Sequence, residues 1–163
     1  MSNYLSPLGS ITGVLQAAGG TVSGIVWGQS SATPPTPGSP WYKQASEPPP
    51  AFPYVVFTIK GTTGEHVMGD PAYEAEFTVS FAVYGTQGNI EAVSSPFAST
   101  GLYHFLDGLA NNPAAFSGTL FDCVGWYSNL DWDVDLEDVR GTDGFTRVYV
   151  SKCSYTMKVN RTG

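Results

Sequence analysis

The chain has 163 residues, of which 7 are Lys or Arg and 14 are Asp or Glu, so its formal net charge is −7. Charged residues make up 13% of the chain, about half of the usual share, whereas hydrophobic residues make up 42% and aromatic residues 13%. This composition excludes an intrinsically disordered chain, and so few cations exclude a groove that binds nucleic acid by neutralising its phosphates. We expect a single globular domain over residues 1–163 with its own hydrophobic core.

Neither a membrane segment nor a metal site is expected. No stretch reaches the roughly 18 consecutive apolar residues of a membrane-spanning helix. The first Lys or Arg of the chain is Lys43, so the N-terminus lacks the cationic region of a secretory signal peptide. Cys123 and Cys153 have no CxxC spacing and no nearby pair of histidines, which favours two buried free thiols over a disulfide or a metal site.

The first expected element is a short helix that begins after Ser6 and ends at Gly19-Gly20. Ser6 is a suitable N-cap, Pro7 suits the first helical position, and apolar residues then recur at helical spacing. A pair of glycines accommodates the left-handed conformation at which many helices end. Residues 21–28 follow as a short expected strand.

A proline-rich segment comes next, over residues 34–53. It contains eight of the twelve prolines of the chain: Pro34, Pro35, Pro37, Pro40, Pro48, Pro49, Pro50 and Pro53. Because proline lacks a backbone N–H, the segment is expected to be a long, stiff and extended loop. Its aromatic residues Trp41, Tyr42 and Phe52 either contact a neighbouring subunit, at a small loss of entropy, or fold back over their own core.

The rest of the chain predicts a sheet with one further helix. Strands are expected at residues 54–59, 77–84, 120–129, 130–139 and 145–159, with a Gly-rich loop at 61–71 and a turn at 140–144. Ser95-Pro96 predicts a helix start, and Phe97, Leu102 and Leu106 would share its apolar face. Val148 and Val150 break the alternation of the last strand and suggest a bulge. The expected fold is α+β: a mostly antiparallel sheet with two helices packed on one face.

Neither of the two histidines indicates a catalytic site. His66 stands in the Gly-rich loop near Glu65 and Asp70, and His104 stands between apolar positions of the second expected helix. Solvated loop charges and a partly buried structural histidine account for both. The chain lacks GxSxG, GxxxxGK[ST] and HExxH, so we expect no catalytic residues and no cofactor.

One segment, residues 130–138, alternates apolar and acidic residues with the period of a strand. In an extended chain one face would then carry a row of four carboxylates, and the other would meet the core. The acidic row consists of Asp131, Asp133, Asp135 and Glu137, and the apolar face of Leu130, Trp132, Val134 and Leu136. Residues 122–143 hold seven of the fourteen acidic residues, which makes this strand the main negative feature of the chain.

The acidic row resembles two known kinds of site only in part. An EF-hand loop also begins Asp-x-Asp-x-Asp, but here Leu136 stands at the sixth position, where Gly belongs, and Thr142 at the twelfth, where Glu belongs. A glycosidase pair would need one carboxyl group buried among apolar side chains. The row is therefore expected to be an exposed face, which either only solubilises the protein or presents negative potential to a partner.

Several segments follow one another in a recognisable order. A short N-terminal helix leads to GIVWG, and a proline-rich stretch ends in FPYVVFTIKG. FTVSFAVYG, SPFASTGLYHFLDGL and DGFTRVYVSKCSYTMKV come after it. In this order, over most of residues 5–159, the chain resembles the tail terminator (tail-completion) proteins of long-tailed bacteriophages.

The resemblance implies a non-enzymatic virion protein, made in the cytoplasm of the host bacterium. Such subunits assemble into a ring, typically a hexamer, at the head-proximal end of the tail tube. The ring ends tube polymerisation and joins the tube protein to the neck or connector protein, and DNA passes through it without specific binding. The four carboxylates of the acidic row would then line the lumen or rim, and the aromatic residues of the proline-rich loop would contact the next subunit.

Two other classes remain open. One is another phage neck, tube or decoration subunit. The other is a carbohydrate-binding β-module, which is suggested by the tryptophans Trp27, Trp41, Trp126 and Trp132 and by nine tyrosines. Coplanar exposed aromatic side chains would favour this second class, whereas the two expected helices weigh against it.

Overall fold

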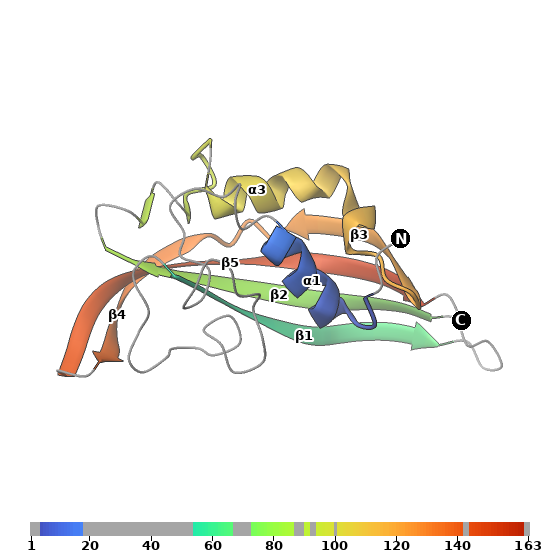
Figure 1. Ribbon diagram of the computed structural model, residues 1–163, viewed down its shortest axis with the longest axis horizontal. Helices are drawn as coiled ribbons and strands as arrows, with labels where there is room; N and C mark the ends of the chain where they lie inside the picture. The colour runs from blue at the N-terminus through green and yellow to red at the C-terminus, as the bar shows by residue number, and fades with distance from the viewer. Residues whose placement is uncertain are drawn as a thin grey trace.

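The structure is a computed structural model that describes residues 4–17, 54–66, 73–86, 90–91, 94–99, 101–141 and 144–161. It has the expected α+β fold, in which an antiparallel sheet is accompanied by the short helices α1 (Pro7–Ala17) and α3 (Leu102–Gly108) (Figure 1). The expected strand at residues 21–28, the proline-rich loop and its aromatic residues Trp41, Tyr42 and Phe52 lie outside the described residues.

The sheet is organised around its last strand. Its five strands are β1 (Tyr54–His66), β2 (Tyr73–Gly85), β3 (Phe121–Ser128), β4 (Asp133–Gly141) and β5 (Gly144–Arg161). One edge of β5 pairs with β2, which in turn pairs with β1. The other edge of β5 pairs first with β4 and then with β3, so these two strands lie one after the other along the same side. Every pairing is antiparallel.

The main core lies between the sheet and the helices. Alternate residues of the central strands, such as Phe81 and Tyr155, belong to the same buried cluster as Leu15 of α1 and Leu106 of α3. The rings of Phe81 and Tyr155 meet edge to face with centroids 5.9 Å apart. Because both helices contribute to one cluster, they cover the same face of the sheet, as the helical and strand periodicities predicted.

A second, smaller cluster explains why two valines depart from the alternation. Val148 and Val150 are buried with Val56 and Tyr84, on the face of the sheet opposite the main core. The expected bulge at these valines is wrong, because the register of β5 against β2 and against β4 is continuous there. The irregular positions lie instead between Gly61 and Thr63 of β1 and between Cys123 and Gly125 of β3.

Two element boundaries differ from the sequence prediction. Strand β1 continues past its irregularity to His66, so half of the expected Gly-rich loop is strand. Helix α3 begins after Gly101 and not at Ser95-Pro96, because the Ser95 hydroxyl accepts the Phe97 N–H at 3.2 Å and closes a local turn. Phe97 is consequently 90% exposed, whereas Leu102 and Leu106 are buried as predicted.

Candidate functional site

The most distinctive feature of the described surface is an arm formed by residues 133–141 of β4 and 144–152 of β5. Strand β2 ends at Gly85, which pairs with Tyr149, so among the described strands only β4 pairs with the part of β5 before Tyr149. The arm therefore extends beyond the rest of the sheet, at the left of Figure 1. Gly144, at the turn between its strands, has a φ of +111°, which glycine adopts without strain.

The pairing of β4 with β5 gives the arm two chemically different faces. On one face Asp133, Asp135 and Glu137 lie opposite Lys152, Val150 and Val148 respectively. On the other face Val134 and Leu136 lie opposite Ser151 and Tyr149. Three residues of the expected acidic row thus share one face, as their period of two predicted. We call Asp133, Asp135 and Glu137 the acidic triplet.

The apolar side of β4 does not meet the core, which corrects the sequence-based expectation. Leu130 is 91% exposed, Trp132 38%, Val134 37% and Leu136 48%, and Phe145 across the arm is 73% exposed. The main contacts of β4 are with β5, and the arm extends past the part of the sheet that the helices cover. We call the side chains Trp132, Val134, Leu136 and Phe145 the apolar stripe.

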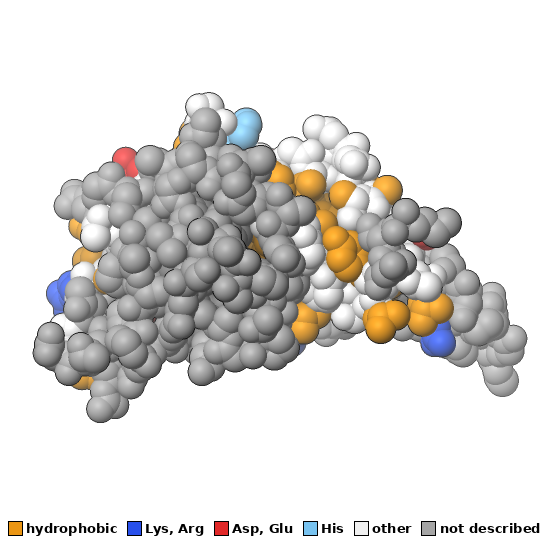
Figure 2. Space-filling model, viewed as in Figure 1, with side chains coloured by type: hydrophobic (Ala, Val, Ile, Leu, Met, Phe, Trp, Pro, Cys, Tyr) orange, Lys and Arg blue, Asp and Glu red, His pale blue; other side chains and the backbone are white. Residues whose placement is uncertain are grey.

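A hollow of about 360 Å³ lies where the apolar stripe meets the body of the protein. It is lined by Ile90, Glu91, Trp132, Asp133, Val134 and Tyr149. Figure 2 shows that hydrophobic side chains also outnumber charged ones on the visible, described part of the helix-bearing face. Exposed apolar patches of this kind mark contact surfaces more often than they mark catalytic sites.

One cation partly balances the acidic triplet. The Lys152 ammonium lies 2.5 Å from a carboxylate oxygen of Glu137. This hydrogen bond raises the pKa of Lys152, and the charges of Asp135 and Asp133 act in the same direction. Burial raises the pKa of Tyr84 to about 12, with a smaller contribution from the charge of Glu137. Three carboxylates against one ammonium group give this face of the arm an excess of acidic side chains.

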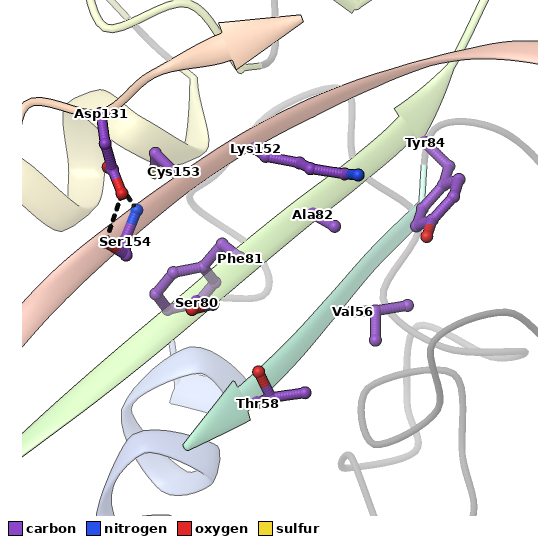
Figure 3. A pocket seen from close by; sticks show the side chains of 10 residues that line it. All are labelled: Val56, Thr58, Ser80, Phe81, Ala82, Tyr84, Asp131, Lys152, Cys153 and Ser154. Atoms are coloured by element: carbon purple, nitrogen blue, oxygen red, sulfur yellow. Dashed lines mark hydrogen bonds between the residues drawn. The ribbon is translucent and has the colours of Figure 1, made fainter. Parts of the chain in front are cut away.

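Asp131 precedes β4 and lies on the same sheet face as Lys152 and the acidic triplet, but its carboxylate is bound to β5. Its carboxylate accepts the Ser154 N–H at 2.8 Å and the Ser154 hydroxyl at 2.5 Å, as the dashed lines in Figure 3 show. Residues 129–132 connect β3 to β4 opposite residues 153–154 of β5, so two extra residues interrupt the ladder. Asp131 therefore holds this junction in place of the missing strand pairing.

The neighbours of Asp131 stabilise the same junction. The Asn129 amide donates to the Ser154 hydroxyl at 2.9 Å and accepts the Thr156 hydroxyl at 2.7 Å. The Trp132 indole N–H donates to the Ser151 hydroxyl at 2.8 Å. Four residues oppose two here, and Leu130 takes a positive φ of 56° within this connection; the strand pairing of β4 begins at Asp133.

A cavity of about 500 Å³ lies on the sheet face opposite the helices (Figure 3). Its lining includes the hydroxyl groups of Thr58 and Ser80 together with Asp131 and Lys152. These two charged groups are already bound within the chain, Asp131 to Ser154 and Lys152 to Glu137. The cavity therefore offers no unpaired acid or base from its lining residues.

The two cysteines are buried as expected, whereas the expectation of a partly buried His104 is wrong, because its side chain is exposed. Burial raises the pKa of the Cys123 thiol to about 11 and that of Cys153 to about 12, and both are free cysteines. His104 is exposed on α3, and the side chain of His66 lies outside the described residues. Within the described ranges no three His, Cys, Asp or Glu side chains are grouped to hold a metal ion, and no helix is long and apolar enough to cross a membrane.

The two described tryptophans do not form a platform for sugars. Trp126 is 2% exposed and stacks on Tyr155, with ring centroids 4.9 Å apart and planes 10° apart. Trp132 is partly exposed, but its indole N–H is bound to Ser151. Trp27 and Trp41 lie outside the described residues.

Comparisons with known proteins add no family: no protein-family model and no curated protein sequence matches the chain. The site is therefore interpreted from its geometry. It consists of an arm with an exposed apolar stripe on one face and an acidic triplet on the other.

Proposed function

We propose that this protein is a structural subunit of a phage virion that acts as a tail terminator. In this proposal it forms a ring at the head-proximal end of the tail tube, ends tube polymerisation and joins the tail to the neck. The observation that carries the proposal is the exposed apolar stripe of the arm. A side chain such as Leu136, 48% exposed on a projecting strand, gains by burial against another protein.

The charge distribution supports the same function. A subunit that contacts neighbours on several sides suits a surface with few charges, and here only 13% of residues are charged. A lumen that carries DNA must not bind phosphates, and the acidic triplet would repel them. We therefore propose Asp133, Asp135 and Glu137 as the lumen or rim face, without Asp131, which is bound to Ser154.

A different neck, tube or decoration subunit would use an exposed apolar stripe in the same way, so it is the second candidate. The carbohydrate-binding alternative is less favoured, because Trp126 is buried and the indole N–H of Trp132 is bound within the chain. Glycan-array binding by a monomer would restore that alternative.

The test is the mass of the particle in solution, measured by light scattering with and without tubes of a purified tail tube protein. A ring, alone or on the tube end, is expected, and electron microscopy should show tubes that no longer elongate. A protein that stays monomeric with tubes present and leaves their length unchanged would refute the proposal.

A matched pair of variants tests the apolar stripe. Leu136→Ser should abolish ring formation or tube binding, while the free energy of unfolding stays within about 1 kcal/mol of wild type because Leu136 is half-exposed. Leu120→Ser is the control, since Leu120 is 49% exposed but lies outside the arm. Equal loss of assembly in both variants would contradict a specific role for the stripe.

A further inference from the structure

We propose that copies of this chain join edge to edge, with the outer edge of β4 in one copy pairing with the outer edge of β1 in the next. This inference rests on the proposed function, since it names the contact between neighbouring subunits of the ring. Within the described residues β4 pairs only with β5 and β1 only with β2, so these strands form the two lateral edges of the sheet.

The hydrogen bonds of β4 indicate that its edge can accept a further strand. The Leu136 N–H donates to the carboxylate of its own neighbour Asp135 at 2.8 Å. An N–H that is bound to a side chain in this way is not donated to β5, so it points to the outer edge of β4. A carbonyl of an added strand would have to replace the carboxylate of the adjacent Asp135 as its acceptor. Strand β4 contains no proline and keeps a continuous register, so its charged side chains are the feature that restricts which strand can pair with its edge.

Strand β3, on the same side of β5, is less suitable. Residues that precede it already bind its outer edge: the Cys123 N–H donates to the Ser117 hydroxyl at 2.9 Å, and the Phe121 carbonyl accepts the Gly118 N–H at 3.0 Å. The open part of this side of the sheet is therefore β4, on the arm that projects from the body.

Strand direction favours β1 as the partner. Each pairing from β1 through β2 and β5 to β4 is antiparallel, so β4 runs opposite to β1. Adding β4 of one copy to β1 of the next continues the alternation and keeps the same face outward. Such a contact joins two different surfaces of the chain, and contacts of this head-to-tail kind give a ring when the rotation between copies closes and an open filament when it does not.

Charge separates this arrangement from the pairing of two β4 strands. Two β4 edges would bring two acidic triplets together, and like charges directly opposite one another on neighbouring strands destabilise a sheet. Strand β1 instead presents the exposed Lys60, which pairs with Thr78 and so lies on the sheet face that also carries Thr58 and the acidic triplet. The charge of the acidic triplet therefore disfavours pairing of β4 with a second β4 and favours its pairing with β1.

Disulfide cross-linking tests this contact directly. Lys60→Cys protein is mixed in turn with Asp133→Cys, Asp135→Cys and Glu137→Cys protein, assembled with tail tubes and oxidised. Residues opposite each other on neighbouring strands have Cβ atoms about 4.5–5.5 Å apart, so small backbone adjustments bring one pair within disulfide range. We expect covalent dimers from at least one mixture, and ladders up to the ring number when both changes are in one chain.

The single variants and the wild-type protein are the controls, because Cys123 and Cys153 are buried and should not react. Rings that form without a cross-link between position 60 and any of the three acidic positions would overturn the edge contact and leave the ring intact. A dimer from Asp135→Cys protein alone would overturn it in favour of pairing between two β4 strands. Absence of rings in wild-type protein with tubes would overturn the proposed function together with this inference.

Discussion

Replacing Asp131 by alanine tests whether this carboxylate holds the junction between β3 and β4 or only adds surface charge. The change removes the acceptor of two hydrogen bonds, from the Ser154 N–H at 2.8 Å and the Ser154 hydroxyl at 2.5 Å. Ser154 is only 8% exposed, so water replaces the lost acceptor poorly. Hydrogen bonds to charged groups contribute about 1.5–3 kcal/mol each. Because Asp131 is partly exposed, we expect the free energy of unfolding to fall by about 2 kcal/mol in total.

The loss is measured as the change in the free energy of unfolding from urea titrations with an unchanged m-value. For a chain of this size, the expected fall in melting temperature is about 4–8 °C. Asp133→Ala is the matched control: its carboxylate is exposed, and its variant should stay within about 0.5 kcal/mol of wild type. Asp131→Asn keeps one acceptor and should fall between them. If Asp131→Ala were no less stable than Asp133→Ala, the junction role would be wrong.

Three further predictions concern the core, the thiols and the arm. Trp126→Ala should lower the free energy of unfolding by about 3–5 kcal/mol. Trp126→Phe keeps an aromatic ring against Tyr155 but loses the indole bond to the Leu106 carbonyl and part of the ring volume, so it should lose less than Trp126→Ala in the same urea titration. Burial raises the pKa of Cys123 to about 11 and that of Cys153 to about 12, against 9.0 in the unfolded chain, so native protein at pH 8.5 should resist iodoacetamide. The contribution of these thiols to stability is fully present below about pH 9 and is lost as the pH rises toward 12. Rapid labelling of the native protein would contradict this. Glu137→Gln removes the ion pair with Lys152, in which the Glu137 side chain is 32% exposed and the Lys152 side chain 46%. The free energy of unfolding should fall by less than about 1 kcal/mol in the same urea titration, and a larger fall would contradict the view that this is a surface ion pair.

The spacing of apolar residues along the sequence correctly predicted one strand and one helix of the main core. The alternation around Phe81 placed that strand with one face in the core, and the spacing of Leu102 and Leu106 placed the second helix. The expected helix start at Ser95 failed, because the same hydroxyl group that caps a helix also closes a short turn. The bulge expected at Val148 and Val150 was wrong for another reason. The sheet has apolar clusters on both faces, so buried residues of β5, its longest strand, point to both sides and do not follow one alternating pattern.

The candidate site shows where periodicity stops being informative. The period of two correctly placed Asp133, Asp135 and Glu137 on one face. It could not tell whether the opposite face meets the core or solvent, because that depends on how far the helices extend over the sheet. It also placed Asp131 on the sheet face that carries Lys152, but it could not show that this carboxylate is bound to Ser154 where the strand pairing is interrupted. A signal was present in the sequence, because Asn129 and Asp131 are residues that commonly bond to nearby backbone where a strand is interrupted.

The position of β5 in the chain has a consequence for synthesis. Strand β5 is the last in chain order, yet β2, β3 and β4 all pair with it. Until residue 161 has left the ribosome, β2 lacks one of its two partners, and β3 and β4 lack the only one they have among the described strands. The sheet therefore closes after translation has passed β5, and until then the unpaired strands depend on chaperones or rapid synthesis to avoid pairing with other chains.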